Sequence, residues 1–221
     1  MRKIHVDDIV ATLRQLCIDA NIEIKPDTVE AYHRALEQEE SETGHEVLQQ
    51  LILNAEAAKE QRIPFCQDTG YAVVCVELGQ NGHITGGSFV DALNEGVRQG
   101  YQQGFLRKSI VQNALERINT GDNTPAVVNT EIVPGDRLKI SLLIKGAGCD
   151  NVSALRMFTP AEGLAAELLE RINSLGIGPA GFGGSVTALG VHIEACATHI
   201  ASFPVAVNVD CHSQRGKEVV I

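Results

Sequence analysis

The first sixty residues place apolar side chains at helical spacing. Residues 6–20 carry an apolar face at positions 9, 10, 13, 16 and 17, and two aspartates at 7 and 8 favour the positive end of a helix dipole. A second helix is predicted to begin at Pro26 and to end in the acidic residues 37–41. A third is predicted over 44–61, with this apolar stripe: Val47, Leu48, Leu51, Ile52 and Ala55. The pattern predicts a helical N-terminal segment, residues 1–62.

After residue 70 the apolar pattern changes to strands separated by turns and helices. Residues 71–78 form an apolar run that ends in a Gln-Asn-Gly turn, and residues 88–104 return to helical spacing behind Ser88 as a predicted cap. A short helix is predicted over 110–118. Residues 126–133 and 137–145 are predicted strands joined by a Pro-Gly-Asp turn, which is typical of an antiparallel pair.

The last third of the chain is rich in glycine between shorter apolar runs. We predict a helix over 160–175 and strands over 186–195 and 203–209. The final triplet 219–221 is apolar, which indicates either a docked strand or contact with a partner. Helices followed by strands that alternate with helices indicate an α+β (mixed α/β) fold. We therefore expect one catalytic domain over 63–221, with the helical segment packed on it.

Composition narrows the classes of partner. The 221 residues contain 28 acidic against 18 basic side chains, giving a formal net charge of −10. A nucleic-acid or anionic-membrane partner needs a basic face, so neither is expected. No apolar run is long enough to cross a bilayer, and the charged start does not match a secretory leader. We expect a cytoplasmic protein.

Six cysteines are scattered along the chain without a Cys-x-x-Cys pair. That spacing excludes a zinc ribbon or a thioredoxin motif, and disulfides are not expected in a cytoplasmic chain. Cys17 and Cys75 lie in apolar patterns and are expected to be small buried side chains. The other candidates, Cys66, Cys149 and Cys211, lie in polar or glycine-rich contexts and are the thiols to consider for chemistry.

The most reactive stretch of the sequence is Pro64-Phe65-Cys66-Gln67-Asp68-Thr69-Gly70. A thiol, an amide, a carboxylate and a hydroxyl stand in four consecutive positions, so the stretch is predicted to be a loop rather than a core strand. The apolar run 71–78 follows at once, and reactive groups on a loop held by a rigid strand are typical of an active site. A turn with one buried thiol is the alternative that the stretch alone leaves open.

Weaker signals lie elsewhere. Arg107 stands before a predicted helix start, where it could bind a carboxylate through two hydrogen bonds, although spacing alone favours a surface pair with Lys108. Residues 145–151 place two glycines beside Lys145, which permits close approach of a bound anion. A lone histidine such as His199 is more often structural than functional.

Taken together, residues 63–70, 145–151, 176–179, 190–194 and 204–211 resemble the alpha subunit of class I fumarate hydratases, a family of iron–sulfur hydro-lyases that includes L-tartrate dehydratase. The resemblance covers nearly the whole chain, and its most specific motif is Cys-Gln-Asp-Thr-Gly. It implies a [4Fe–4S] cluster whose open iron polarises the leaving hydroxyl while a base takes a proton from the neighbouring carbon.

The resemblance also implies roles for individual residues. Cys66 and Cys211 match cluster ligands, and Asp68 matches a carboxylate that takes part in acid–base transfer. The residues that match substrate contacts are Gln67, Asp68, Arg107, Gly148 and His199.

One part of the family pattern is missing. Relatives carry the third cluster cysteine in a Cys-Pro-Pro segment followed by a glycine-rich stretch, whereas here Gly163 runs directly into Leu164. Cys149 is not a convincing substitute, and two thiolates do not make a three-thiolate site. Three explanations stay open: a deletion, a segment absent from the printed sequence with the numbering closed over it, or a degenerate paralogue.

The resemblance further implies a beta part, here expected as a separate chain, with a dimer of alpha–beta units as the assembly. The expected reaction is reversible hydration of fumarate to L-malate. L-tartrate dehydration, a cluster-less scaffold and a redox-sensing cysteine protein are the alternatives.

Overall fold

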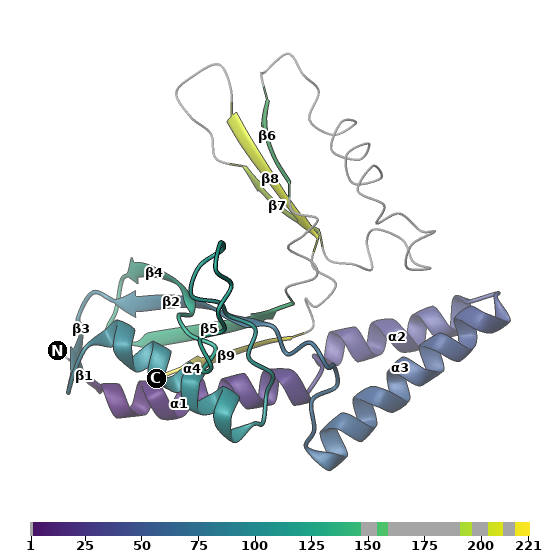
Figure 1. Ribbon diagram of the computed structural model, residues 1–221, viewed down its shortest axis with the longest axis horizontal. Coiled ribbons are helices and arrows are strands. Elements are labelled where there is room, and N and C mark those ends of the chain that lie inside the picture. Colours follow the sequence, from purple (N-terminus) through teal and green to yellow (C-terminus); the bar gives the residue numbers. More distant parts are fainter. Residues whose placement is uncertain (1, 147–153, 159–190, 196–202, 210–214) are drawn as a thin grey trace. The chain divides into compact units, whose positions relative to one another are not determined.

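A computed structural model describes residues 2–146, 154–158, 191–195, 203–209 and 215–221 (Figure 1). The chain divides into two compact units. The first comprises residues 1–145 together with 214–221, and the second comprises residues 146–213.

The N-terminal part of the first unit is helical, as predicted. A short strand β1 (Arg2–His5) leads into α1 (Val6–Ile22), α2 (Pro26–Gln38) and α3 (Glu42–Gln61). Each helix begins at a residue suited to its position. The His5 ring accepts from the N–H of Asp7, Pro26 occupies the first turn of α2, and the Ser41 hydroxyl accepts from the N–H of Gly44. The three predicted helices are confirmed.

A four-stranded mixed sheet forms the centre of the first unit. Its strands are β2 (Tyr71–Gly79), β4 (Val127–Val133), β5 (Leu138–Lys145) and β9 (Gly216–Val220), in the order β4-β2-β5-β9. β4 runs parallel to β2, whereas β5 is antiparallel to both β2 and β9. A separate parallel pair joins β1 to β3 (Gly82–Thr85). The α+β fold is confirmed, and the apolar C-terminal triplet belongs to a docked strand and its end.

The predicted antiparallel pair of 126–133 with 137–145 is wrong. Both strands exist, but β2 lies between them. The connection over residues 134–137 crosses the end of β2 and accepts N–H groups at and just after that end, with Gly79 donating to the Arg137 carbonyl at 2.7 Å and Asn81 donating to the Gly135 carbonyl at 2.8 Å. A turn of this length can therefore span an intervening strand when its carbonyls satisfy that strand's end.

One face of the sheet is covered by α1 and α4 (Phe89–Gln103). Alternate residues of β5 face this core, and all four are at most 2% exposed: Leu138, Ile140, Leu142 and Ile144. The two helices pack closely because α4 presents glycine to α1. A Cβ at Gly100 would lie 2.6 Å from the Cβ of Cys17, and one at Gly96 would lie 2.9 Å from that of Leu13.

Three local predictions are wrong. Residues 110–118 are not a helix, because the Asn113 side chain accepts from the N–H groups of Leu115 and Glu116 and an isolated bridge joins Val111 to Asn119. Cys75 is exposed, because the alternation along β2 turns it away from the helices. On α3, Val47 and Leu51 are 50% and 39% exposed, and its buried side chains are Ile52, Ala55 and Ala58.

The second unit contains an antiparallel sheet of β6 (Ala154–Phe158), β8 (Phe203–Val209) and β7 (Val191–Ala195), in that order. The predicted strand at 203–209 is confirmed, and that at 186–195 is confirmed over Val191–Ala195. The predicted helix at 160–175 lies outside the described residues. Within the described part, no helix has the length and apolarity that a membrane span requires.

Candidate functional site

The stretch that the sequence singles out is a loop, residues 63–70, which we call the Cys66 loop. It begins where Arg62 ends α3 in a left-handed conformation (φ 56°) and ends at Gly70, which is also left-handed (φ 56°). Its first half is held from two helices. The N–H of Phe65 donates to the Asn21 carbonyl at 3.1 Å, and the Asn54 amide donates to the Phe65 carbonyl at 2.8 Å. The predicted loop mounted on a strand is confirmed.

The second half of the Cys66 loop rests on buried polar side chains. The Tyr101 hydroxyl, from α4, donates to the carbonyls of Thr69 and Gly70 at 2.7 and 3.1 Å. The Asp68 carboxylate accepts from the N–H of Gly70 at 3.0 Å, which closes a local turn. Tyr101 is fully buried, and this burial raises the pKa of its phenol well above the usual range. The phenol therefore stays protonated and able to donate at neutral pH.

A second irregular segment, residues 105–123, carries Arg107 and lies against the first; we call it the Arg107 segment. The Thr69 hydroxyl donates to the Arg107 carbonyl at 2.9 Å. Asn123 is fully buried, accepts from the N–H groups of Ser109 and Ile110 at 2.6 and 3.2 Å, and donates to the Gly70 carbonyl at 3.1 Å. One amide side chain thus folds the Arg107 segment and fastens it to the Cys66 loop.

Arg215, just before β9, supports the Cys66 loop from inside the first unit. It is fully buried, and its guanidinium Nη1 donates to the Asp68 carbonyl and, at 3.5 Å, to the Asn21 side chain. The guanidinium carbon also lies 5.7 Å from the centre of the Phe65 ring.

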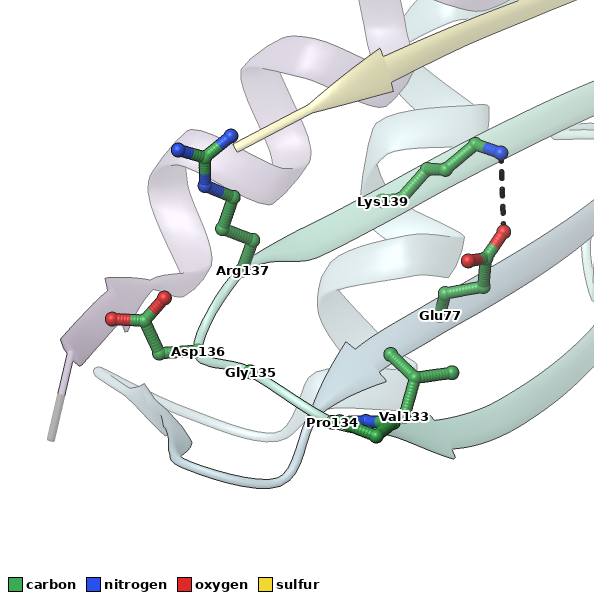
Figure 2. A pocket seen from close by; sticks show the side chains of 7 residues that line it. All are labelled: Glu77, Val133, Pro134, Gly135, Asp136, Arg137 and Lys139. Carbon is green, nitrogen blue, oxygen red and sulfur yellow. Dashed lines mark ion pairs between the residues drawn. The ribbon is translucent and has the colours of Figure 1, made fainter.

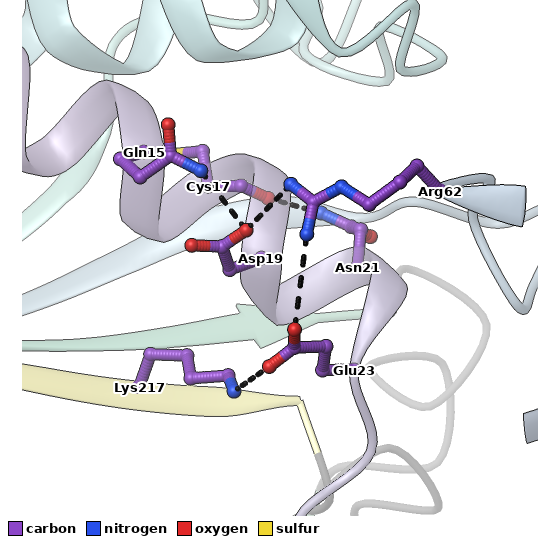
Figure 3. A network of polar contacts seen from close by, with 7 residues as sticks. All are labelled: Gln15, Cys17, Asp19, Asn21, Glu23, Arg62 and Lys217. Atoms are coloured by element: carbon purple, nitrogen blue, oxygen red, sulfur yellow. Dashed lines mark hydrogen bonds and ion pairs between the residues drawn. The ribbon is translucent and has the colours of Figure 1, made fainter. Parts of the chain in front are cut away.

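A surface network fixes the end of α1 beside the start of the loop (Figure 3). Arg62 pairs with Asp19 at 2.9 Å and with Glu23 at 3.7 Å, and Glu23 also pairs with Lys217 of β9 at 2.9 Å. These pairs are only partly buried, and ion pairs near the surface contribute little individually. Together they join the end of α1, Arg62 at the start of the Cys66 loop, and β9 to one another.

The polar contacts leave the reactive side chains accessible. Cys66 and Asp68 are partly buried, Gln67 and Arg107 are exposed, and Cys66 is a free thiol. The structure thus brings four of the predicted site residues to two adjoining segments. The other three, Gly148, His199 and Cys211, lie outside the described residues.

A hollow at the opposite end of the sheet is not part of this site. It is lined by the ends of β2, β4 and β5 and by the turn between the last two (Figure 2). Glu77 and Lys139 form an ion pair across it at 3.1 Å. The Cys66 loop precedes the first residue of β2, so the hollow lies a strand's length away from it.

The described residues alone do not fit a three-thiolate cluster. Among them, no group of three or more His, Cys, Asp or Glu side chains is arranged to hold a metal ion. Cys66 is the one predicted ligand in the described part of the chain. A cluster would need Cys211 and a third donor in addition.

Comparison with known proteins gives the family. The sequence-family model described as fumarate hydratase (Fumerase) matches residues 10–166 and 162–220 of this chain. The chain belongs to the fumarate hydratase (Fumerase) family. The family match therefore covers the Cys66 loop and the Arg107 segment in its first part and β9 in its second.

Relatives of this family member fall into two groups. One protein named "Putative L(+)-tartrate dehydratase subunit alpha", from Methanocaldococcus jannaschii, is 29% identical over 275 aligned positions that cover 95% of each chain. The L(+)-tartrate dehydratase subunit alpha of Escherichia coli O157:H7 is 24% identical, covering 86% of this chain and 82% of that one. The anaerobic class I fumarate hydratase of Escherichia coli K12 is 32% identical over 79% of this chain, but that match spans 33% of the relative.

Sequence reasoning missed the residues that hold the loops in place, namely Asn21, Tyr101, Asn123 and Arg215. Asn123 and Arg215 carried a weak signal, because a polar side chain between a turn and a strand often serves a backbone group. Tyr101 carried none, since its position on the apolar face of α4 is typical of a core residue.

Proposed function

We propose that this chain is the alpha-type subunit of an iron–sulfur hydro-lyase that acts on a C4 dicarboxylate, with reversible hydration of fumarate to L-malate as its reaction. The observation that carries the proposal is the Cys66 loop. Four of its carbonyls, those of Phe65, Asp68, Thr69 and Gly70, accept from side chains of which three are buried (Tyr101, Asn123 and Arg215) and one is exposed (Asn54). Its thiol, amide and carboxylate side chains are therefore presented on a well-held backbone beside Arg107. Membership of the fumarate hydratase family supports the reaction class.

The roles of the loop side chains follow from their chemistry. Arg107 presents a planar guanidinium that can bind one substrate carboxylate through two parallel hydrogen bonds. The Gln67 amide can donate to a substrate carboxylate, and it can donate to or accept from a substrate hydroxyl. Asp68 exchanges a proton with the substrate, acting as the base in dehydration and as the acid in hydration. Gly148 and His199 are proposed to complete the substrate contacts, as the resemblance implies.

The cofactor proposed for this chain is a [4Fe–4S] cluster held by Cys66 and Cys211 with a third thiolate. The two cysteines are proposed as ligands because residues 63–70 and 204–211 resemble the family's cluster-binding segments. When bound, the cluster would supply a Lewis acid for the hydroxyl group.

The third thiolate is proposed to belong to a segment that is missing between Gly163 and Leu164. Two observations support this. The family match is broken into two parts that meet at residues 162–166. The alignment with the Methanocaldococcus jannaschii protein runs over 275 positions, more than the 221 residues of this chain, so that relative has residues without a counterpart here.

The partner proposed for this chain is a beta-type subunit that covers the Arg107 segment. Two whole-length relatives are named as subunit alpha, which implies a second subunit in those proteins. On this chain, Phe105 and Leu115 are 93% and 95% exposed on the segment that carries Arg107. Large, exposed apolar side chains on a segment beside a candidate site are typical of a protein interface.

L-tartrate dehydration is the second candidate reaction. It is favoured by the coverage of the relatives, because the chain spans 95% and 82% of two tartrate dehydratase alpha proteins but about a third of the fumarate hydratases. Fumarate hydration is favoured by the higher identity, 32% against 24% and 29%.

The experiment that separates these candidates compares three substrates under one condition. The chain with its missing segment restored and its beta-type partner present is reconstituted anaerobically with iron and sulfide, then supplied with fumarate, L-malate or L-tartrate. We expect iron–sulfur absorbance and turnover of fumarate and malate, both lost in Cys66→Ser. Turnover of tartrate alone would select the second candidate, and the absence of a cluster would contradict the hydro-lyase proposal.

A further inference from the structure

Arg215 is a buried cation, and a contribution to stability does not by itself explain why it is buried. Its side chain is fully buried, and an arginine cannot give up its proton to avoid the cost of desolvation. Within the described part of the chain its Nε and Nη2 groups have no hydrogen-bond partner, and no ion pair to a carboxylate is formed. An apolar side chain of similar volume would fill this space at lower cost.

The contacts that Arg215 does make all lead to the Cys66 loop. Nη1 donates to the carbonyl of Asp68, which follows Cys66 by two residues, and the guanidinium lies over the ring of Phe65, which precedes it. The same Nη1 reaches the Asn21 side chain, and the Asn21 carbonyl accepts from the N–H of Phe65. The guanidinium therefore holds the loop backbone on both sides of Cys66 and Gln67.

Arg215 is itself held by the sheet. Its backbone carbonyl accepts from the N–H of Ile144 at 2.9 Å, which extends the ladder between β5 and β9 by one bond. The side chain thus joins a fixed point of the sheet to a loop that has no strand partner of its own.

We propose that Arg215 is a positioning residue that fixes the direction of the Cys66, Gln67 and Asp68 side chains by holding the loop backbone on either side of them. Its role in the reaction rests on the proposed function of that loop. The uncompensated charge has a second consequence. It gives a positive potential beneath the loop in a chain of net charge −10, which favours binding of an anionic dicarboxylate there.

Three cysteines of this chain make the proposal testable without cofactor, substrate or partner. Cys75 is exposed and reports the intrinsic rate of alkylation, Cys17 is fully buried and reports global unfolding, and partly buried Cys66 reports the loop. The full chain is treated with iodoacetamide under native conditions, and each cysteine is followed by peptide mass spectrometry. The variants are Arg215→Met and, as a matched control that removes an exposed cation of β1 by the same substitution, Lys3→Met.

The expected result is that Arg215→Met raises the alkylation rate of Cys66 relative to Cys75 by about tenfold while Cys17 stays protected. Lys3→Met should leave all three rates unchanged. Arg215→Lys should restore only part of the protection, because an ammonium group cannot lie flat on Phe65 and also reach both acceptors. An unchanged rate at Cys66, or a parallel rise at Cys17 and Cys66, would overturn the proposal.

If Arg215→Met fails to fold, Phe65→Leu removes the ring from the loop side and leaves the buried charge in place. It should raise the alkylation rate of Cys66 by about threefold with Cys17 still protected, and an unchanged rate would count against the proposed role of Arg215. The result of the alkylation experiment does not depend on the proposed reaction. A chain without hydro-lyase activity but with this cysteine pattern would refute the proposed function and retain the role of Arg215 on the loop.

Discussion

The Cys66 loop and the Arg107 segment are both irregular and adjoin each other, yet they are built in opposite ways. The first presents small polar side chains and has its carbonyls occupied by donors from α3, α4 and the residue before β9. The second is folded around one of its own residues, Asn123, and leaves Phe105 and Leu115 almost fully exposed. A loop fixed from outside preserves the geometry of its reactive groups, whereas a loop fixed from within can offer its outer face to a partner.

Removal of Asn123 should have the largest effect, because this residue joins the two regions. In Asn123→Ala the N–H groups of Ser109 and Ile110 and the carbonyl of Gly70 lose a partner inside the protein. We expect a loss of about 3 kcal/mol in the free energy of unfolding, measured by urea denaturation.

Asn113 provides the matched control in the same segment. Its side chain also accepts from two backbone N–H groups, but it is exposed, so water can replace it. Asn113→Ala should lower the free energy of unfolding by less than about 1 kcal/mol. Equal losses in the two variants would show that Asn123 does not join the regions in the way described.

Alkaline pH should weaken the support of the Cys66 loop, an effect of intermediate size. Burial raises the pKa of the Tyr101 phenol and of the Cys17 thiol in the folded chain, from reference values of 10.0 and 9.0. Their stabilising effect is complete below those reference values. As the pH rises above about 9, the unfolded chain releases protons that the folded chain retains. The free energy of unfolding therefore falls, by up to about 1.4 kcal/mol per pH unit for each group.

Denaturation in urea at a series of pH values between about 8 and 10.5 measures this slope. Cys17→Ala should make the slope shallower by about one proton's contribution, and Tyr101→Phe by another. An unchanged slope in both variants would exclude these two groups as the cause of the alkaline loss of stability.

The Arg107 segment should respond to acid instead. Burial of Asp122 opposes ionisation, but hydrogen bonds from Thr124 and Thr120 outweigh it and lower the pKa, so its contribution is present above 3.8 and is lost below.

Changes on the outer face of the Arg107 segment should have the smallest effect on stability. In Phe105→Ser with Leu115→Ser, little apolar contact is lost, and the free energy of unfolding should change by less than about 0.5 kcal/mol. If this face binds a beta-type subunit, co-purification with that subunit should be lost in the same variant. Retained association, measured by analytical ultracentrifugation, would place the interface elsewhere.

The periodic parts of the chain were predictable because their cause is local. The spacing of Ile9 and Leu13 on α1 and the alternation along β5 follow from burial of one face, and the structure buries those faces. The helix predicted at 110–118 failed for the opposite reason. Its apolar residues have helical spacing, but the Asn113 side chain competes for the N–H groups that a helix would use.

The candidate site was predictable in its reactive residues and not in its supports. Cys66, Gln67 and Asp68 are conspicuous because polar groups stand in a row before an apolar strand. Tyr101 and Arg215 act on the loop from 31 or more positions away, through contacts that only the packed chain creates. The order of the strands could not be predicted from local sequence either, because the position of β2 between β4 and β5 depends on the whole sheet.

The pairing of β5 with β9 makes the second unit an insertion between two neighbouring strands. The chain leaves the first unit after Lys145 and returns at Gln214, and a ladder bond joins the flanking residues, because the N–H of Ile144 donates to the Arg215 carbonyl. Lengthening or shortening what lies between costs little closure entropy, which grows only with the logarithm of loop length. Relatives can therefore gain or lose dozens of residues there while the sheet that carries the Cys66 loop stays unchanged.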